Sequence, residues 1–150
     1  MKMDDENQLL IIRGLPGSGK SRLGARQDCM MVAADDHFYD ENGVYRFNPK
    51  DLPAAHANCL NTTRACLECG NDVVVHNTFS CRWEIQPYLD LAEETNSLVV
   101  VVDLFDGGLT DEELFERNTH GVPLETIRAM RARWEHDWRI GNPLPPWERN

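Results

Sequence analysis

Long hydrophobic runs are absent from the 150-residue sequence, and this absence limits what the protein can be. The longest apolar stretches, 9–12 and 98–102, fall far short of the roughly 20 residues that a membrane-spanning helix needs. Residues 1–6 carry three acidic side chains and lack the basic-then-apolar pattern of a signal peptide. We therefore expect a soluble, cytoplasmic chain without membrane contact, folded as a single domain over residues 1–150.

Positive charge is also scarce, because 25 Asp and Glu residues outnumber 15 Lys and Arg residues and give a net charge of −10. This balance argues against a broad basic surface for nucleic acid but leaves room for a local basic groove. The five cysteines are an odd number, and the lone C-x-x-C pair, Cys66 and Cys69, has no partner pair or histidines at zinc-finger spacing. We expect reduced thiols, with neither zinc nor disulfides.

One motif is complete: residues 14–21 read Gly-Leu-Pro-Gly-Ser-Gly-Lys-Ser, a G-x-x-x-x-G-K-[ST] phosphate-binding loop. The glycines let backbone N–H groups turn inward around phosphates, Lys20 reaches the β- and γ-phosphates, and the Ser21 hydroxyl is placed to ligate Mg²⁺. The sequence therefore predicts a site for ATP and Mg²⁺. The residues expected to bind the nucleotide are Gly14, Leu15, Pro16, Gly17, Ser18, Gly19, Lys20 and Ser21.

Hydrophobic periodicity predicts alternating strands and helices. The expected strands are 9–13, 30–34, 72–75 and 97–104, and the expected helices open at 20 and run over 53–69, 83–94 and 124–138. This order is typical of an α/β fold, here a three-layer sandwich of the P-loop NTPase type with a mostly parallel sheet of four to five strands and helices on both faces. The β-branched run over 97–104 predicts a central strand that is covered on both faces.

The last third of the chain predicts a helical lid at about 109–128. Thr110 and Glu113 form a capping box that begins a helix, and a break near 119–123 separates it from the next helix. The proline-rich tail, 141–150, is expected to be irregular.

Polar residues follow the second and third predicted strands, and the carboxyl ends of parallel strands meet at the edge of the sheet where ligands bind. We expect Asp35 to accept the proton of a hydroxyl group, and Asp36 to fix a water or to share the metal with Ser21. The alternative for both acids is that they cap the next segment. Asn77 and Thr78 follow the third strand and are expected to contact the acceptor.

Arginines on the predicted lid supply positive charge. Closing the lid would exclude water and bring Arg117 to the transferring phosphate, while Arg128 and Arg131 would contact the acceptor. The alternative is a solvated helix face. An Asn-Lys-x-Asp motif for guanine is absent, and the third strand does not end in the Asp-Glu of mechanical ATPases, so a kinase is favoured over both classes.

The sequence resembles the small P-loop kinases related to the kinase domain of bacteriophage polynucleotide 5′-kinase. The resemblance covers about 9–138 and includes the phosphate loop, the two aspartates, Tyr-Arg-Phe-Asn-Pro at 45–49, Asn77-Thr78, and Arg-Asn…His-Gly-Val-Pro over 117–123. It implies an ATP-dependent kinase of nucleic-acid hydroxyls with Asp35 as general base and Arg117 in the lid. Phage relatives, which work in the host cytoplasm, include kinases of 5-hydroxymethyluracil in DNA.

Three residues depart from the family pattern. His76 stands where the family has an aspartate, Phe79 replaces a polar residue, and Phe38 replaces an arginine that binds the acceptor's 3′-phosphate. An aromatic side chain at position 38 either stacks on a base, worth roughly 1–3 kcal/mol, or packs in the core.

The acceptor that these departures favour is the hydroxymethyl group of 5-hydroxymethyluracil in DNA. A polynucleotide 5′-hydroxyl is one alternative. A free nucleoside, nucleotide or small metabolite is another, which the acidic charge favours. A nucleotide-binding module without catalysis is a third, because His76 replaces an acid. The residues expected to contact the acceptor are Asp35, Asp36, Phe38, Asn77, Thr78, Arg128 and Arg131.

Overall fold

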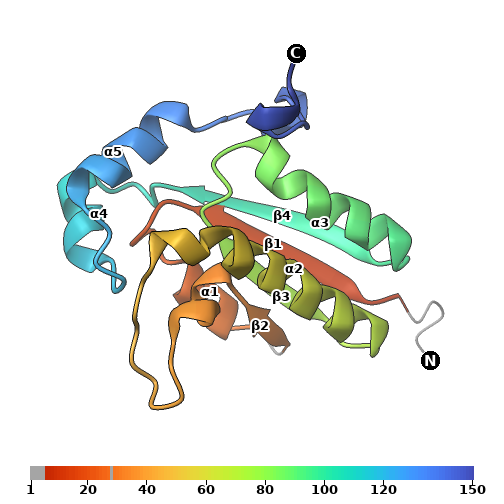
Figure 1. The fold of residues 1–150 in the computed structure, drawn as a ribbon. Coiled ribbons are helices and arrows are strands. Elements are labelled where there is room, and N and C mark those ends of the chain that lie inside the picture. Colours follow the sequence, from red (N-terminus) through yellow and green to blue (C-terminus); the bar gives the residue numbers. More distant parts are fainter. Residues whose placement is uncertain (1–5, 28) are drawn as a thin grey trace.

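The computed structural model describes residues 6–27 and 29–150 and has an α/β fold (Figure 1). Its parallel sheet has the strand order β2-β3-β1-β4. The strands are β1 (Gln8–Gly14), β2 (Met30–Val32), β3 (Val73–Asn77) and β4 (Leu98–Phe105). The α-helices are α1 (Lys20–Ala25), α2 (Leu52–Glu68), α3 (Arg82–Glu94), α4 (Asp111–Arg117) and α5 (Leu124–Arg133). The 3₁₀ turns are Ala34–Phe38, Pro49–Asp51, Trp138–Ile140 and Pro146–Glu148.

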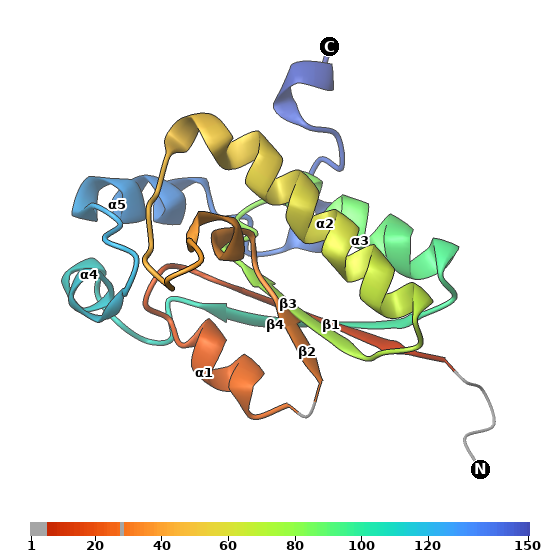
Figure 2. The ribbon, with the colours of Figure 1, turned by 60° about the horizontal axis from the view of Figure 1, so that its bottom comes forward.

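Helices cover both faces of the sheet, as the alternating pattern predicted. Figure 2 shows α1 on one face and α2 with α3 on the other, while α4 and α5 lie beyond the carboxyl ends of the strands. The central strand β1 and its neighbour β3 bury continuous apolar runs, because each face of both strands meets a helix. Their fully buried apolar side chains are Leu9, Ile11, Ile12, Val73, Val74 and Val75.

The predicted central position of the 97–104 strand is wrong. β4 pairs with β1 and is an edge strand of the described sheet, with Leu98 and Val100 more than half exposed. The valine-rich sequence predicts a strand, but it does not determine whether one or two other strands pair with it. The segment after β4 builds α4 and α5 near the ends of the strands instead of a strand beside β4.

Two predicted boundaries also differ. The strand predicted over 30–34 ends at Val32, because Ala34–Phe38 forms a 3₁₀ turn. The helix predicted to reach residue 138 ends at Arg133, because Trp134 turns into the core at 6% exposure and the Glu135 N–H donates to the Ser80 carbonyl at 2.8 Å.

Predictions that depend on short sequence motifs agree with the structure. The Thr110 hydroxyl accepts from the Glu113 N–H at 3.2 Å and the Glu113 carboxylate accepts from the Thr110 N–H at 3.1 Å, which confirms the capping box. The Asn42-Gly43 pair is typical in sequence of a tight turn, and the structure has one there, since Gly43 has a φ of +77° and Tyr39 bridges Tyr45 in antiparallel pairing.

Two features concern only the part of the chain that the structure describes. No helix there has the length and apolar character needed to cross a bilayer. No disulfide joins the cysteines of residues 6–27 and 29–150.

Candidate active site

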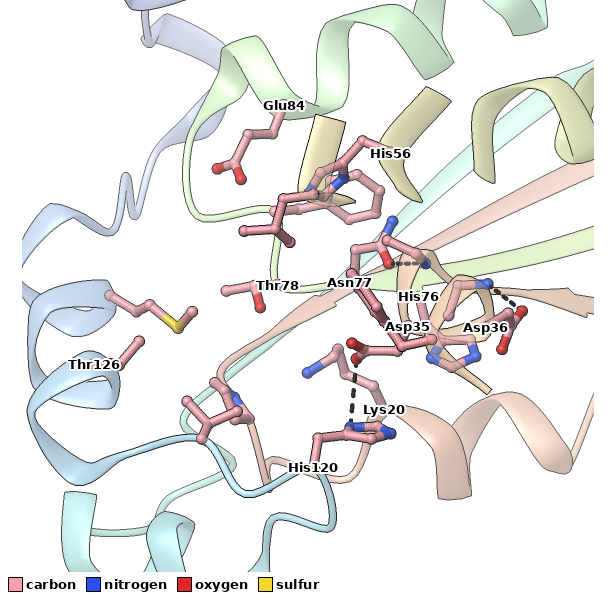
Figure 3. Close-up of a pocket in the computed structure, with 18 of the residues that line it drawn as sticks. Lys20, Asp35, Asp36, His56, His76, Asn77, Thr78, Glu84, His120 and Thr126 are labelled. Carbon is pink, nitrogen blue, oxygen red and sulfur yellow. Dashed lines mark hydrogen bonds and ion pairs between the residues drawn. The ribbon is translucent and has the colours of Figure 1, made fainter. Parts of the chain in front are cut away.

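A cleft of about 1640 Å³ opens where the carboxyl ends of the strands meet α4, α5 and the segment between them, the part of the chain that the sequence predicts as a lid (Figure 3). Its walls come from the phosphate loop, the turn that carries Asp35, the end of β3, the first turns of α2 and α3, and the lid segment 117–123. Pockets for one small ligand usually measure about 300–1,000 Å³. The cleft therefore has room for a nucleotide and a second substrate group.

The phosphate loop packs closely against α4. Gly17 and Gly19 have φ angles of +82° and +106°, which residues with a Cβ rarely adopt, and a Cβ on Gly17 would lie 2.4 Å from the Leu114 carbonyl oxygen. Gly19 is the N-cap of α1, whose first N–H groups have no acceptor within their own helix. The loop therefore offers N–H donors to phosphate while holding the lid close.

Lys20 is a half-buried residue of the loop. Its ammonium donates to the carbonyl oxygens of Gly14 at 2.8 Å and Leu15 at 3.1 Å. Burial lowers the pKa of Lys20 to about 8, and the nearby charge of Asp35 opposes that shift. A bound triphosphate would favour the charged form, because it supplies opposite charge in the same buried place.

ATP affinity is expected to fall as pH rises above about 8. Below that pH Lys20 is already charged in the free protein, whereas above it each binding event must also take up a proton, so Kd should rise by up to about tenfold per pH unit. Calorimetry across this range, in buffers that differ in ionisation enthalpy, measures both affinity and proton uptake. Lys20→Arg keeps its charge and should lose this pH dependence. A wild-type Kd that stays constant on both sides of the Lys20 pKa contradicts the prediction.

Asp35 points into the cleft close to Lys20 (Figure 3). The Tyr45 hydroxyl donates to Asp35 Oδ1 at 3.0 Å, and His120 Nδ1 of the lid lies 3.4 Å from Oδ2. Burial, with the charge of Asp35, raises the pKa of Tyr45, so its hydroxyl stays protonated as a donor. The carboxylate is 45% exposed and open to a second substrate, as a general base must be.

Asp36 and Asn77 support the turn that carries Asp35. Asp36 Oδ2 accepts from the Ala33 N–H at 2.9 Å, and Asn77 Oδ1 accepts from the Ala34 N–H at 2.8 Å. The capping alternative therefore describes Asp36. Both residues line the cleft together with Thr78, whose carbonyl oxygen accepts from the Gly14 N–H at 3.2 Å.

Of the two alternatives for Phe38, the structure favours packing in the core over stacking on a base. Phe38 is 5% exposed, and its ring packs edge-on against Tyr45 and Phe47 at centroid distances of 6.1 and 5.0 Å. Phe79 is likewise a core residue, 3% exposed and packed against Tyr88. Both departures from the family pattern fill the core beside the site.

The three predicted arginines occupy different places. Arg117 is exposed, lines the cleft, and has no ion pair or hydrogen bond to any described residue. Arg128 pairs with Glu112 at 2.8 Å, and neither it nor Arg131 lines the cleft. Arg131 is held by Asp106, Asp111 and the Leu109 carbonyl. The structure therefore brings only Arg117 to the site, while Arg128 and Arg131 brace the lid.

The metal prediction rests on Ser21. Within residues 6–27 and 29–150, no cluster of three His, Cys, Asp or Glu side chains could hold an ion by itself. Mg²⁺ at phosphate sites usually takes one or two protein oxygens, with phosphates and waters completing the shell. Ser21 lines the cleft and fits that pattern, whereas Asp36 already accepts a backbone N–H.

Sequence reasoning assigned no role in the site to four residues that the structure places in or beside it. Tyr45 and His120 hold Asp35, and His76 lies in the cleft, where burial lowers its pKa and keeps it neutral. Arg13 is fully buried behind the loop, where it pairs with Asp103 at 2.9 Å and lies 4.0 Å over the Trp134 ring. A charged residue at the end of an apolar strand was the available signal for Arg13.

A phosphate loop after the central strand, an acid after β2 and a helical lid together define a kinase-like P-loop fold. The chain belongs to the AAA domain family, whose match spans residues 9–136. It is 32% identical over 134 residues to NEDD4-binding protein 2 of Homo sapiens, a match covering 85% of this chain and 8% of that protein.

Solved structures share the fold at low identity. A chain of the Pnkp1/Rnl/Hen1 RNA repair complex has a TM-score of 0.68 at 21% identity, over 88% of this chain and 45% of its own length. A putative kinase from Chloroflexus aurantiacus has a TM-score of 0.63 at 16% identity, over 92% and 85% of the two chains. The chain thus spans under half the length of NEDD4-binding protein 2 and of the repair-complex chain.

Proposed function

We propose that this chain is an ATP-dependent kinase that transfers the γ-phosphate to a hydroxyl group on a nucleic acid. The observation that carries the proposal is the pairing, within one cleft, of the Lys20 phosphate loop with the Asp35 carboxylate. A nucleotide-binding module needs the loop alone. A kinase also needs a base beside the transferring phosphate and an opening for the acceptor.

The residues fit a balanced transfer. Asp35 accepts the proton of the acceptor hydroxyl while that oxygen bonds to the γ-phosphorus and the bond from phosphorus to the β–γ bridging oxygen breaks. ADP leaves, and Asp35 later releases its proton to water. Lys20 and Arg117 stabilise the negative charge of the phosphates. Mg²⁺ bound through Ser21 would neutralise further phosphate charge.

Size and lining of the cleft support a nucleic-acid acceptor. The volume exceeds that of a site for one small ligand. Trp83 and Trp147 lie in the wall with their ring centroids 5.4 Å apart, and exposed aromatic rings bind bases without net positive charge. The fold is shared with a chain of an RNA repair complex, which favours the same class of acceptor.

A 5′-hydroxyl end is the first acceptor to test. The preference for 5-hydroxymethyluracil drew on Phe38 in place of the family's arginine, and Phe38, at 5% exposure, offers little surface on which a base could stack. The hydroxymethyl group, favoured from the sequence, becomes the second acceptor to test, and a base within a duplex would have to flip out to reach Asp35.

An acceptor screen tests the proposal. The protein is incubated with γ-labelled ATP and, separately, with 5′-hydroxyl DNA, 5′-hydroxyl RNA, 5-hydroxymethyluracil DNA and free nucleosides, and the products are digested to locate the label. Label on a polymer supports the proposal, and its position separates the strand end from the modified base. Label confined to free nucleosides, or ATP binding without transfer to any acceptor, overturns it.

A further inference from the structure

His120 joins the lid to the side of the cleft that faces the acceptor. It lies between α4 and α5, yet its contacts are with the hairpin that follows β2. Its Nε2 is 3.1 Å from the Tyr39 hydroxyl, its ring centroid is 4.6 Å from that of Tyr45, and its Nδ1 is 3.4 Å from Asp35 Oδ2. Figure 3 shows the imidazole below the Asp35 carboxylate.

The lid backbone is shaped to present this side chain. Asn118 accepts from the Val122 N–H at 2.9 Å and donates to the Phe115 carbonyl at 2.8 Å, closing the segment around His120. Gly121 has a φ of +68°, a conformation that favours glycine. His120 is only one quarter exposed. A solvated loop would need none of these constraints.

The same segment is anchored to the phosphate loop. The backbone of Leu114 packs on Gly17 so closely that a Cβ on the glycine would collide with it. The same Leu114 carbonyl accepts from the Asn118 N–H at 2.9 Å. Leu114 therefore contacts both the phosphate loop and the segment that holds His120. Two backbone contacts therefore connect the phosphate loop to the segment that holds His120.

We infer that His120 is a positioning residue, which holds the Asp35 carboxylate toward the acceptor hydroxyl only while the lid lies against the phosphate loop. The inference rests on the proposed function, in which Asp35 is the base. Tyr45, in the hairpin that follows β2, donates to Asp35 Oδ1, and His120, between α4 and α5, lies against Oδ2. The base is thus held from two sides, by the hairpin after β2 and by the segment between α4 and α5.

A single tautomer of a neutral imidazole accommodates both contacts. With the proton on Nδ1, the ring donates toward Asp35 Oδ2, and Nε2 accepts from the Tyr39 hydroxyl. The distance of 3.4 Å to Oδ2 exceeds that of a short hydrogen bond, and such contacts commonly tighten when substrate binds.

Kinetics of His120 variants test the inference. His120→Ala should lower kcat by about 10–100-fold while the KM for ATP changes less than about twofold, because orientation of the base is lost and nucleotide binding is kept. His120→Asn, whose amide nitrogen takes the place of Nδ1, should recover more of the loss than His120→Gln, which replaces Nε2. An unchanged kcat in His120→Ala, or better rescue by glutamine, overturns the inference.

A double-mutant cycle separates positioning from a merely structural role. In an Asp35→Asn background, His120→Ala should lower the rate no further, because the group that it orients has already lost its function. Equal losses in the two backgrounds contradict an action through Asp35. Thermal unfolding of each variant, with and without ATP, shows whether the lid still folds.

A spectroscopic measurement keeps the inference testable if no hydroxyl is phosphorylated, an outcome that refutes the proposed function alone. The ring ¹⁵N signals of His120 should shift in Asp35→Asn and in Tyr39→Phe. They should stay in place in Glu41→Gln, which removes a nearby exposed charge outside the contact. If the His120 ring ¹⁵N signals shift neither in Asp35→Asn nor in Tyr39→Phe, the inference is overturned.

Discussion

Asp35→Asn is expected to lower the rate of phosphoryl transfer by about 10²–10⁴-fold, the usual contribution of a positioned general base. The amide keeps the size of the side chain and can still accept from the Tyr45 hydroxyl, but it cannot take the proton of the acceptor. Nucleotide binding should be nearly intact, because Lys20 and the loop are unchanged. Single-turnover transfer from labelled ATP, alongside calorimetric ATP binding, measures the two effects separately.

Glu41→Gln is the matched control for this loss of charge. It removes one carboxylate from the same acidic stretch, and Glu41 is exposed in the hairpin after Asp35. Tyr45→Phe provides a graded variant, since it removes one contact to the carboxylate and leaves the base in place. Wild-type turnover in Asp35→Asn removes Asp35 from the role of base.

Arg13→Ala is expected to lower the free energy of unfolding by about 3–5 kcal/mol, because a fully buried side chain and its hydrogen bonds to buried carbonyls are lost together, although Asp103 is one third exposed. Its guanidinium is fully buried and donates to Asp103 and to three backbone carbonyls, those of Phe79, Ser80 and Glu135. Without it, the buried carbonyls lose their donor and the Trp134 ring loses the cation above it. Urea unfolding at neutral pH measures the difference.

Arg128→Ala is the comparison for Arg13. Arg128 also makes an ion pair, with Glu112, but both side chains are more than half exposed. Exposed pairs of this kind add little to stability, so its unfolding midpoint should stay near that of the wild type. Equal destabilisation by the two substitutions contradicts the structural role assigned to Arg13.

The elements that the sequence predicted best depend on local chemistry. The phosphate loop, the capping box at Thr110 and the turn at Gly43 each need specific residues at fixed spacing, so a short stretch of sequence suffices. The parallel sheet followed from the alternation of periods. Asp35 could be placed at the site because a parallel sheet brings strand ends together.

The errors arose where contacts between distant segments decide the outcome. The sequence of β4 predicts a strand, but its edge position depends on where the following chain goes. Phe38 is buried because Tyr45 and Phe47 fold back over it. Arg131 is held by Asp106 and Asp111, 25 and 20 residues earlier in the sequence, and so braces the lid instead of reaching the cleft.

The contact between His120 and Asp35 was out of reach for the same reason. The two residues are separated by most of the described chain and meet only because the lid folds over the hairpin. The family signature marked the lid segment without assigning its histidine a partner. Long-range contacts of this kind define the acceptor side of the site, whereas the donor side is encoded in eight consecutive residues, 14–21.

The most direct test is transfer of labelled γ-phosphate to a 5′-hydroxyl oligonucleotide by the wild-type protein and by Asp35→Asn. The expected result is acid-stable label on the oligonucleotide with the wild type, and a loss of about 10²–10⁴-fold with the variant while both proteins bind ATP. If both proteins bind ATP and neither labels any nucleic acid, including 5-hydroxymethyluracil DNA, the chain is not a nucleic-acid kinase.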